Sequence, residues 1–586
     1  MKKEAGSREQ RGLTLVEVLV GTAIFLTVAV AAYGSFAGLF KIVNLAQYQE
    51  LAINVANEQM EIIRNMPYQD VGVVGSLLNG NVPHIQTITR GGVQFNVEAI
   101  IRGIDLPADG VAGGTPNDTN PLDNKLVSLT VSCAACGNTQ PLTITGQVAP
   151  LALENTGNTG SIFVHVHDSS GKPIQGANVA VTNTQTSQTT NDVTDDTGTL
   201  ALVGVPPGAN AYHIVVTKTG YSSDQTYPGG NNPDTNVVTG QVSETYFFID
   251  KVSSFVIASV SPTCQPVPNY DFHLTSSKET APGVPKYSQN KQTDGSGQLT
   301  LSSLEWDTAG YTLTPTDAAY DLSGSNPMSP IALNPGATVN LQLVAVPHDQ
   351  SALMISVIDD TTKQPISGAA VRLYGNGYDE TETTGQGFIS QEDWSGGGGQ
   401  ESYVDKSKYE DGQNVDASSP GHLRLINDGF TGYDPSGWLQ SSTFDMGTTS
   451  NFNIIRWLPV SQLSASTSIK LKFETAADPP PTGSWAFNGP EYTVSNSSLS
   501  ATPNRYARYE VLASTSDPAY TPDLTNVGFF YTSDCLPPGQ VLFQGLSFGD
   551  SYNIDITVAG YTPVAGDLVN IDDPQWKQKD ERLSPI

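Results

Sequence analysis

Basic residues are scarce in this chain of 586 residues: 28 Lys and Arg stand against 58 Asp and Glu, which gives a net charge of −30. Nucleic-acid binding depends on Lys and Arg that neutralise phosphates, so this balance argues against a nucleic-acid partner. The four cysteines are too few for a disulfide scaffold. The seven histidines are scattered, and they form neither a His-Glu-x-x-His motif nor a Ser/His/Asp arrangement with a nucleophile elbow. We therefore predict no catalytic residue, no metal site and no cofactor.

Long apolar runs are also absent, apart from one near the amino terminus. Glycine and proline are frequent instead, with 56 and 38 residues, and 38% of all residues are hydrophobic. Such a composition leaves material for several cores and is typical of a string of β-domains. At roughly 150 residues per domain, the length predicts about four domains.

The one long apolar run extends from Val18 to Phe40 without a charged residue. As a helix it would be about 35 Å long, enough to cross a hydrocarbon core of ~30 Å. Residues 1–12 before it carry a net positive charge, which predicts an amino terminus on the cytoplasmic side. A removable signal peptide fits poorly, because the run is too long and no small-x-small cleavage site follows it. Glu17 lies at its start, and a lone carboxylate in hydrocarbon needs a partner.

Residues 11–17, Arg-Gly-Leu-Thr-Leu-Val-Glu, resemble the class III signal of type IV pilins and pseudopilins. The resemblance implies that a prepilin peptidase cuts between Gly12 and Leu13 and methylates the new amine of Leu13. It also implies that Glu17 serves filament assembly by pairing with the amine of a neighbouring pilin subunit in the apolar filament core. Residues 1–12 would be a cleaved leader, and residues 13–40 a transmembrane and filament-core helix.

The helix is predicted to continue beyond the membrane, because apolar residues recur at helical spacing. These residues are Leu45, Tyr48, Ala52, Val55, Ile62 and Met66. Pro67 should end the helix. Alternating apolar residues at 93–101 and 127–131 predict two half-buried strands. They fit the small antiparallel sheet of pilins, so residues 13–150 are expected to form a pilin-like α+β module.

A loop rich in Gly, Pro, Asn and Asp joins these two strands over residues 102–125, and it contains Asp105, Asp109, Asp118 and Asp123. One interpretation is a calcium loop, as in some pseudopilins, because calcium needs oxygen ligands. The other is a solvated loop, which we favour because the acidic residues have no regular ligand spacing.

Cys133 and Cys136 form the only Cys-x-x-Cys pair. Without a second such pair zinc is not expected, and outside the cytoplasm a local disulfide is the prediction. Cys264 and Cys535 precede matching strands of two related modules, and the sequence leaves open whether they pair or stay unpaired.

The rest of the chain contains an internal repeat of short strands separated by Pro/Gly turns. Residues 172–177, Lys-Pro-Ile-Gln-Gly-Ala, correspond to residues 364–369, Gln-Pro-Ile-Ser-Gly-Ala. The pattern resembles the carboxypeptidase regulatory-like domain, a β-sandwich related to the Cna-B type that lacks the peptidase zinc site. The resemblance implies all-β sandwiches at 151–250, at 251–347 in divergent form, and at 348–410 together with 535–586.

The last copy is interrupted, so residues 411–534 are expected to form an inserted domain. Its short strands and turns suggest a jelly-roll-like fold, and most of its many aromatic residues are expected in the core. Residues 505–509, Arg-Tyr-Ala-Arg-Tyr, faintly resemble discoidin-like sandwiches that bind sugars or surfaces. A surface glycan or a protein is therefore a candidate ligand.

Together these features predict a single-pass protein of the inner membrane with its carboxyl-terminal part outside the cytoplasm, and later in an extracellular filament. With over 500 residues outside the membrane, it is expected to be a minor or tip subunit of a type IV pilus-like filament with adhesive β-domains. The alternative is a pseudopilin of a type II secretion or DNA-uptake system. A hydrolytic insert on a membrane anchor is the third hypothesis, and no sequence motif favours it.

Overall fold

The computed structural model describes residues 14–118, 120–134, 136, 140–150, 158–399, 407–479 and 485–586. The predicted leader and the predicted cut between Gly12 and Leu13 lie outside the described residues. The chain divides into two compact units, Met1–Asp250 and Lys251–Ile586.

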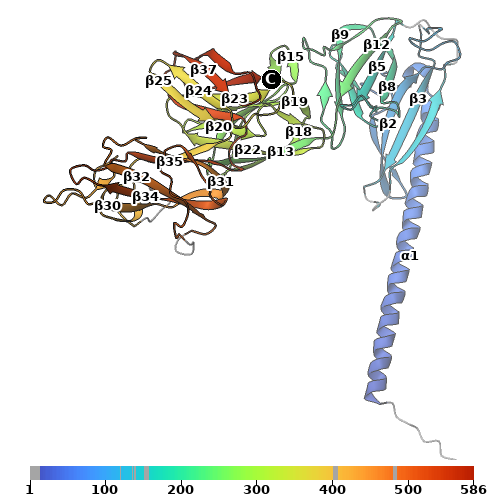
Figure 1. Cartoon of the computed structure of the whole chain (residues 1–586). Helices are drawn as coiled ribbons and strands as arrows, with labels where there is room; N and C mark the ends of the chain where they lie inside the picture. The colour runs from blue at the N-terminus through green and yellow to red at the C-terminus, as the bar shows by residue number, and fades with distance from the viewer. Residues whose placement is uncertain are drawn as a thin grey trace, which may run out of the picture. The chain divides into compact units, whose positions relative to one another are not determined.

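The first unit begins with one continuous helix, α1 (Leu15–Arg64), drawn in blue in Figure 1. Its 50 residues correspond to a length of about 75 Å. Asn65 is its carboxyl-terminal cap, and Pro67 follows in extended conformation before the short 3₁₀ helix η1 (Tyr68–Asp70). The predicted end of the helix is confirmed, since proline cannot continue it.

The second half of α1 packs on the pilin-like head through Val55, Ala56, Met60 and Ile63, which are buried. The prediction that Ile62 belongs to this stripe is wrong, because its side chain is 46% exposed. Consecutive residues of a helix are about 100° apart, and Ile63 lies on the same face as Ala56 and Met60 whereas Ile62 lies to one side of it.

The head sheet is a four-stranded antiparallel meander in the order β1-β2-β3-β4. Its strands are β1 (Ile85–Arg90), β2 (Val93–Ile104), β3 (Asn124–Ser132) and β4 (Leu142–Val148). Alternate residues of β2 and β3 are buried against the helix, as the period-2 pattern predicts. Gly146 on β4 allows close approach, because a Cβ there would lie 2.7 Å from Met60 Sδ.

The head continues into a β-sandwich within the same unit. Its first sheet has the order β12-β5-β8, and its second has the order β10-β9-β6-β7 with β11 beside β9. The strands are β5 (Gly160–His167), β6 (Asn178–Asn183), β7 (Gln188–Val193), β8 (Thr199–Val205), β9 (Gly208–Thr217), β10 (Asp224–Gln225), β11 (Thr235–Val237) and β12 (Val242–Phe248). The Leu77 N–H donates to Thr190 Oγ1 at 3.1 Å, and Arg102 pairs with Asp192 at 3.3 Å, so head and sandwich are in direct contact.

The second unit opens with another sandwich, built from sheets in the orders β18-β13-β22-β20 and β17-β14-β19-β21, with a small hairpin β15-β16. The strands are β13 (Ser253–Val260), β14 (Asp271–Ser276), β15 (Glu279–Ala281), β16 (Val284–Pro285), β17 (Ser288–Gln292), β18 (Gln298–Leu304), β19 (Asp307–Pro315), β20 (Tyr320–Asn326), β21 (Ile331–Leu333) and β22 (Thr338–Pro347).

The third sandwich is assembled from two separate stretches of chain, with sheets in the orders β36-β23-β39 and β25-β24-β37-β38. The strands are β23 (Ser351–Asp359), β24 (Ala370–Gly375), β25 (Tyr378–Thr383), β36 (Gln540–Leu546), β37 (Ser551–Thr557), β38 (Val564–Asn570) and β39 (Trp576–Leu583). In all three sandwiches the first strand pairs in parallel with the last one and antiparallel with a strand between them.

The intervening chain forms a further sheet in the order β26-β35-β31-β34-β30-β27, with β32 beside β34 and β33 beside β31. The strands are β26 (Gly387–Gln391), β27 (Tyr409–Gln413), β30 (Ser436–Ser441), β31 (Phe444–Leu458), β32 (Thr467–Ala476), β33 (Ser497–Ser498), β34 (Asn504–Thr515) and β35 (Asn526–Thr532). A separate pair consists of β28 (Val415–Asp416) and β29 (Arg424–Leu425). Ile389 of β26 and Trp394 are buried in the hydrophobic core of this sheet. The core therefore includes residues that precede the predicted boundary at 411.

The fold class is thereby confirmed as one long amino-terminal helix packed on a small antiparallel sheet, followed by β-sandwiches. The limits of the individual domains remain predictions, because sheets and cores alone do not show which segments fold independently.

We expect Val55→Asp to unfold the head, because it buries an unpaired carboxylate at a fully buried position. The expected loss is roughly 3–5 kcal/mol of unfolding free energy. The measurement is thermal unfolding of the full chain in detergent, with limited proteolysis of residues 85–148. Ile53→Asp, two positions earlier on a side chain that is 45% exposed, is the control and should leave the melting temperature of the head nearly unchanged. Equal effects of both variants would contradict this docking of the helix.

Candidate functional site

The amino-terminal end of α1 is organised around Thr14 and Glu17. Thr14 Oγ1 accepts a hydrogen bond from the Glu17 N–H at 3.3 Å, and the Thr14 N–H donates to Glu17 Oε2 at 2.9 Å. This reciprocal arrangement is a capping box, which satisfies helix N–H groups that have no intrahelical partner. Within a single chain, the Glu17 carboxylate therefore bends back toward the start of its own helix.

The role of Thr14 was missed from the sequence, although its signal is present. Thr14-x-x-Glu17 has the spacing of a capping box directly before an apolar run. Gly12 and Leu13 lie outside the described residues, so the geometry of the predicted cut is not part of the structure.

The first half of α1 presents apolar side chains on every face. From Leu15 to Val43, its large hydrophobic residues are 49–80% exposed. The helix is long and apolar enough to cross a membrane, although a signal sequence passes the same test of length and composition. An apolar surface on all sides is stable in lipid or against other apolar helices, and it is unstable in water.

Lys125 on β3 fixes the segment that follows the helix. Its Nζ donates to the carbonyl oxygens of Tyr68 at 2.9 Å and Val71 at 2.6 Å, and it lies 4.6 Å from the centre of the Tyr68 ring. Burial lowers the pKa of Lys125, and the Asp70 charge opposes that shift. The buried ammonium group of Lys125 thus holds the segment that follows the carboxyl-terminal end of α1 in place.

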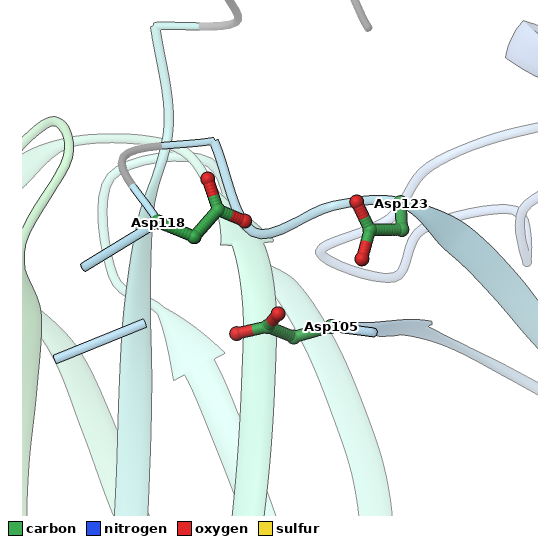
Figure 2. Close-up of side chains that lie close together, drawn as sticks. All are labelled: Asp105, Asp118 and Asp123. Carbon is green, nitrogen blue, oxygen red and sulfur yellow. The ribbon is translucent and has the colours of Figure 1, made fainter. Parts of the chain in front are cut away.

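The acidic loop of the head brings Asp105, Asp118 and Asp123 together. Asp109, the fourth acidic residue that the sequence places in 102–125, is not part of the group. Figure 2 shows the three carboxylates facing a common space, with Asp105 and Asp123 on one side and Asp118 on the other.

The four cysteines are paired in the structure. Cys133 and Cys136 form the local disulfide, with their Cα atoms 5.5 Å apart. Cys264 and Cys535, which the sequence left open, form a second one within the second unit, with a Cα–Cα distance of 5.4 Å. This second disulfide is packed against apolar side chains of the second sandwich.

Most aromatic side chains of the inserted sheet form its core. The buried members are Phe444, Phe452, Trp457, Phe473, Phe487, Tyr492, Tyr506, Tyr509, Phe529 and Tyr531. The arginines of the discoidin-like stretch have partners inside the molecule: Arg505 holds Asp445 through two hydrogen bonds, and Arg508 binds Thr443 Oγ1 at 2.6 Å. These arginines therefore stabilise the sheet.

A cleft of about 620 Å³ lies beside the β28–β29 pair. Asp416, Arg424 and Tyr433 contribute to its lining, together with Tyr409 of β27. The Arg424 guanidinium is held by Asp523 at 2.7 Å. The cleft thus combines aromatic and charged side chains in a space large enough for a small ligand.

Comparison with known families assigns two parts of the chain. Residues 7–33 match the prokaryotic N-terminal methylation motif. The amino terminus carries a pilin-type methylation motif. Residues 161–245 match the carboxypeptidase regulatory-like domain, which covers the first sandwich from β5 to β12. Both resemblances drawn from the sequence are confirmed.

The methylation motif implies processing by a prepilin peptidase and assembly with other pilin subunits, and the apolar helix supports anchoring in a membrane. Together with the regulatory-like domain, the motif supports a pilin-type surface subunit with a structural rather than an enzymatic role.

No curated protein sequence matches the chain. Among solved structures, the Bacillus anthracis TIE protein is 13% identical and covers 52% of this chain and 67% of its own, with a TM-score of 0.15. The Streptococcal ancillary pilin is 12% identical and covers 39% and 83%, with a TM-score of 0.15. GBS52, the minor pilin in Streptococcus agalactiae, is 13% identical and covers 32% and 97%, with a TM-score of 0.18. At these TM-scores the similarities carry no argument about function.

We expect Thr14→Val to loosen the first turn of α1, because it removes the hydroxyl that caps the Glu17 N–H. A lost cap costs ~1 kcal/mol, which corresponds to roughly fivefold faster amide hydrogen exchange at residues 16–18. Exchange would be measured on the full chain in detergent. Thr22→Val is the matched control, since its hydroxyl donates only to the carbonyl groups of Val18 and Leu19. Unchanged exchange in Thr14→Val would show that the capping box does not stabilise the helix start.

Proposed function

We propose that this chain is a membrane-anchored prepilin that is cut, methylated and assembled as a large minor or tip subunit of a type IV pilus-like filament, where it displays adhesive β-domains. The observation that carries the proposal is the methylation motif at 7–33 placed on a helix whose first half is apolar on all sides. A filament core of packed helices offers such a surface the same apolar surroundings that the membrane offers before assembly.

In this proposal the prepilin peptidase cuts between Gly12 and Leu13 and methylates the amine of Leu13. The cut removes a leader with a net positive charge and creates a new cationic amine close to the start of α1. Glu17 then has two alternative partners, namely the Thr14 cap within its own chain and the amine of a neighbouring subunit. The second is charged, and in apolar surroundings a charged partner stabilises the carboxylate far more than a neutral one.

The size of the part beyond the helix supports a minor or tip position. The head, three sandwiches and the inserted sheet all follow α1 on one chain. A subunit of this bulk would crowd a dense filament if it occupied every position. Adhesion is the use that we propose for the β-domains, with the cleft beside β28 and β29 as the candidate contact for a surface glycan or a protein.

Glu17→Ala is expected to block incorporation into filaments and to leave cleavage and methylation intact. The neighbouring amine would lose its only proposed anionic partner in an apolar core, so we expect at least a ~10-fold loss of subunit from purified filaments. Immunoblots of sheared filaments measure incorporation, and the mass of the amino-terminal peptide reports cleavage and methylation. Glu50→Gln, an exposed carboxylate farther along α1, is the control and should assemble normally. Mutant subunits present in filaments at the wild-type level would overturn the role of Glu17.

Labelling of intact cells separates the proposed filament from the alternative, a pseudopilin of a secretion or DNA-uptake system. We expect a membrane-impermeant reagent, or an antibody against residues 411–534, to reach the chain on intact cells and to mark filaments in electron micrographs. A pseudopilin that works below the cell surface would become accessible only after the outer layers are opened. That result would contradict the adhesive filament and leave the methylation motif unaffected.

A further inference from the structure

A groove of about 320 Å³ lies on the inserted sheet, over strands β27, β30, β34 and β32. These strands are neighbours, since β30 pairs with β27 and β34, and β32 pairs with β34. Figure 1 shows β30, β34 and β32 side by side. Along β34, Leu512 of the groove stands between the buried Val511 and Ala513, so its side chain points away from the core. The groove therefore lies on the outer face of the sheet.

The register of the strands sets the main side chains of the groove in one row across this face. Gln413 of β27 lies opposite Trp438 of β30. Leu512 of β34 lies opposite both Trp438 and Lys470 of β32. Neighbouring strands are about 4.8 Å apart, so Trp438 and Lys470 stand roughly 10 Å apart on either side of Leu512. An apolar side chain thus forms the floor, with an indole on one side and a cation on the other.

The cation of the groove is neutralised within it. Lys470 Nζ donates to Glu491 Oε2 at 2.9 Å. This hydrogen bond and the charge of Lys470 lower the pKa of the Glu491 carboxyl group, so it stays ionised at neutral pH. The described residues that line the groove therefore carry no net charge. A charged ligand finds no unpaired opposite charge among them, whereas a neutral ligand with hydroxyl groups can bind both members of the pair.

Several polar groups of the groove are available to a ligand. The Nε1–H of Trp438 and the amide of Gln413 have no hydrogen-bond partner among the described residues. Asn414 has a left-handed backbone with φ of 57°, and its Nδ2 donates to the Ser436 carbonyl oxygen at 3.3 Å. A Cβ at Gly437 would lie 2.6 Å from the Asn414 carbonyl oxygen, so glycine lets this turn close one end of the groove.

The indole of Trp438 is placed differently from others in this part of the chain. Trp394 and Trp457 are buried in the core of the inserted sheet, whereas Trp438 is partly exposed in the groove. A pyranose ring carries C–H groups on its faces and hydroxyl groups around its rim. The indole offers a flat apolar surface for such a face, and the amides and the ion pair offer donors and acceptors for the hydroxyl groups. An aromatic side chain with a few polar groups is typical of a small-ligand site.

We propose that this groove binds a neutral saccharide built of hexopyranose units. Trp438 stacks on the face of one sugar ring, and the ion pair opposite it binds the hydroxyl groups of the same saccharide. The inference rests on the adhesive role proposed above, and it gives that role a ligand class and a location apart from the cleft beside β28 and β29. The discoidin-like stretch 505–509 does not line the groove.

The test is calorimetric titration of the full chain with neutral hexasaccharides of glucose, mannose and N-acetylglucosamine, in a detergent without a sugar headgroup. We expect at least one of them to bind. Trp438→Ala removes the stacking surface and should weaken that binding at least about tenfold. Phe430→Ala is the matched control, because this aromatic side chain is 96% exposed in the same part of the chain but lies outside the groove. It should bind like the unaltered chain.

Folding of the variants is checked by thermal unfolding. If Trp438→Ala lowers the melting temperature, Gln413→Ala replaces it, since this side chain is exposed, and should weaken binding about fivefold. The proposal would be overturned if no neutral hexasaccharide bound, if the folded groove variant bound like the unaltered chain, or if Phe430→Ala lost binding equally. Tighter binding of a heparin hexasaccharide would overturn the choice of a neutral ligand. None of these results bears on filament assembly, which is read separately from sheared filaments.

Discussion

The structure depends on one constraint: a single continuous helix must be stable in two different environments, one along each half. The first half of α1 exposes apolar side chains on every face, and the second half buries a narrow stripe centred on Val55 and Met60. The hydrophobic effect forces the first half into lipid or into a bundle of similar helices, and it forces the second half onto the head sheet. Every β-domain follows α1 along the chain. The half of the helix that is apolar on all faces lies farthest from these domains in the sequence, and the half that packs on the head lies next to them.

Periodic patterns allowed much of this fold to be predicted. The apolar run, the stop at Pro67 and the alternation of β2 and β3 are local signals, and each corresponds to an observed element. The remaining differences depend on the path of the chain in space. Ile63 is buried in place of Ile62 because it lies on the face of Ala56 and Met60, and Trp394 joins the core of the inserted sheet. Likewise, no spacing in the sequence shows that the aspartates of the β2–β3 connection converge, whereas the capping box of Thr14 could have been found from its motif.

Two carboxylates in this molecule illustrate how it handles negative charge away from water. Glu17 lies at the start of an apolar helix and is held by the neutral groups of Thr14. Asp118 lies in the head, where a peptide N–H satisfies one oxygen and leaves the other without a donor among the described residues. In both places neutral donors orient the carboxylate without neutralising it. For Glu17, the proposed amine of a neighbouring subunit would supply the missing positive charge.

The disulfide between Cys264 and Cys535 has a mechanical consequence. The two residues are separated by 271 positions, so the bond closes a covalent loop around most of the second unit. A force that pulls on the two ends of this unit passes through the sulfur atoms and cannot extend the chain between them. At ~3.4 Å per extended residue, the loop contains roughly 900 Å of chain that a pulling force cannot extend while the disulfide is intact. Within this unit, only residues 251–263 and 536–586 lie outside the loop and can lengthen under load, whereas the inserted sheet lies inside the loop and carries no tension along the chain.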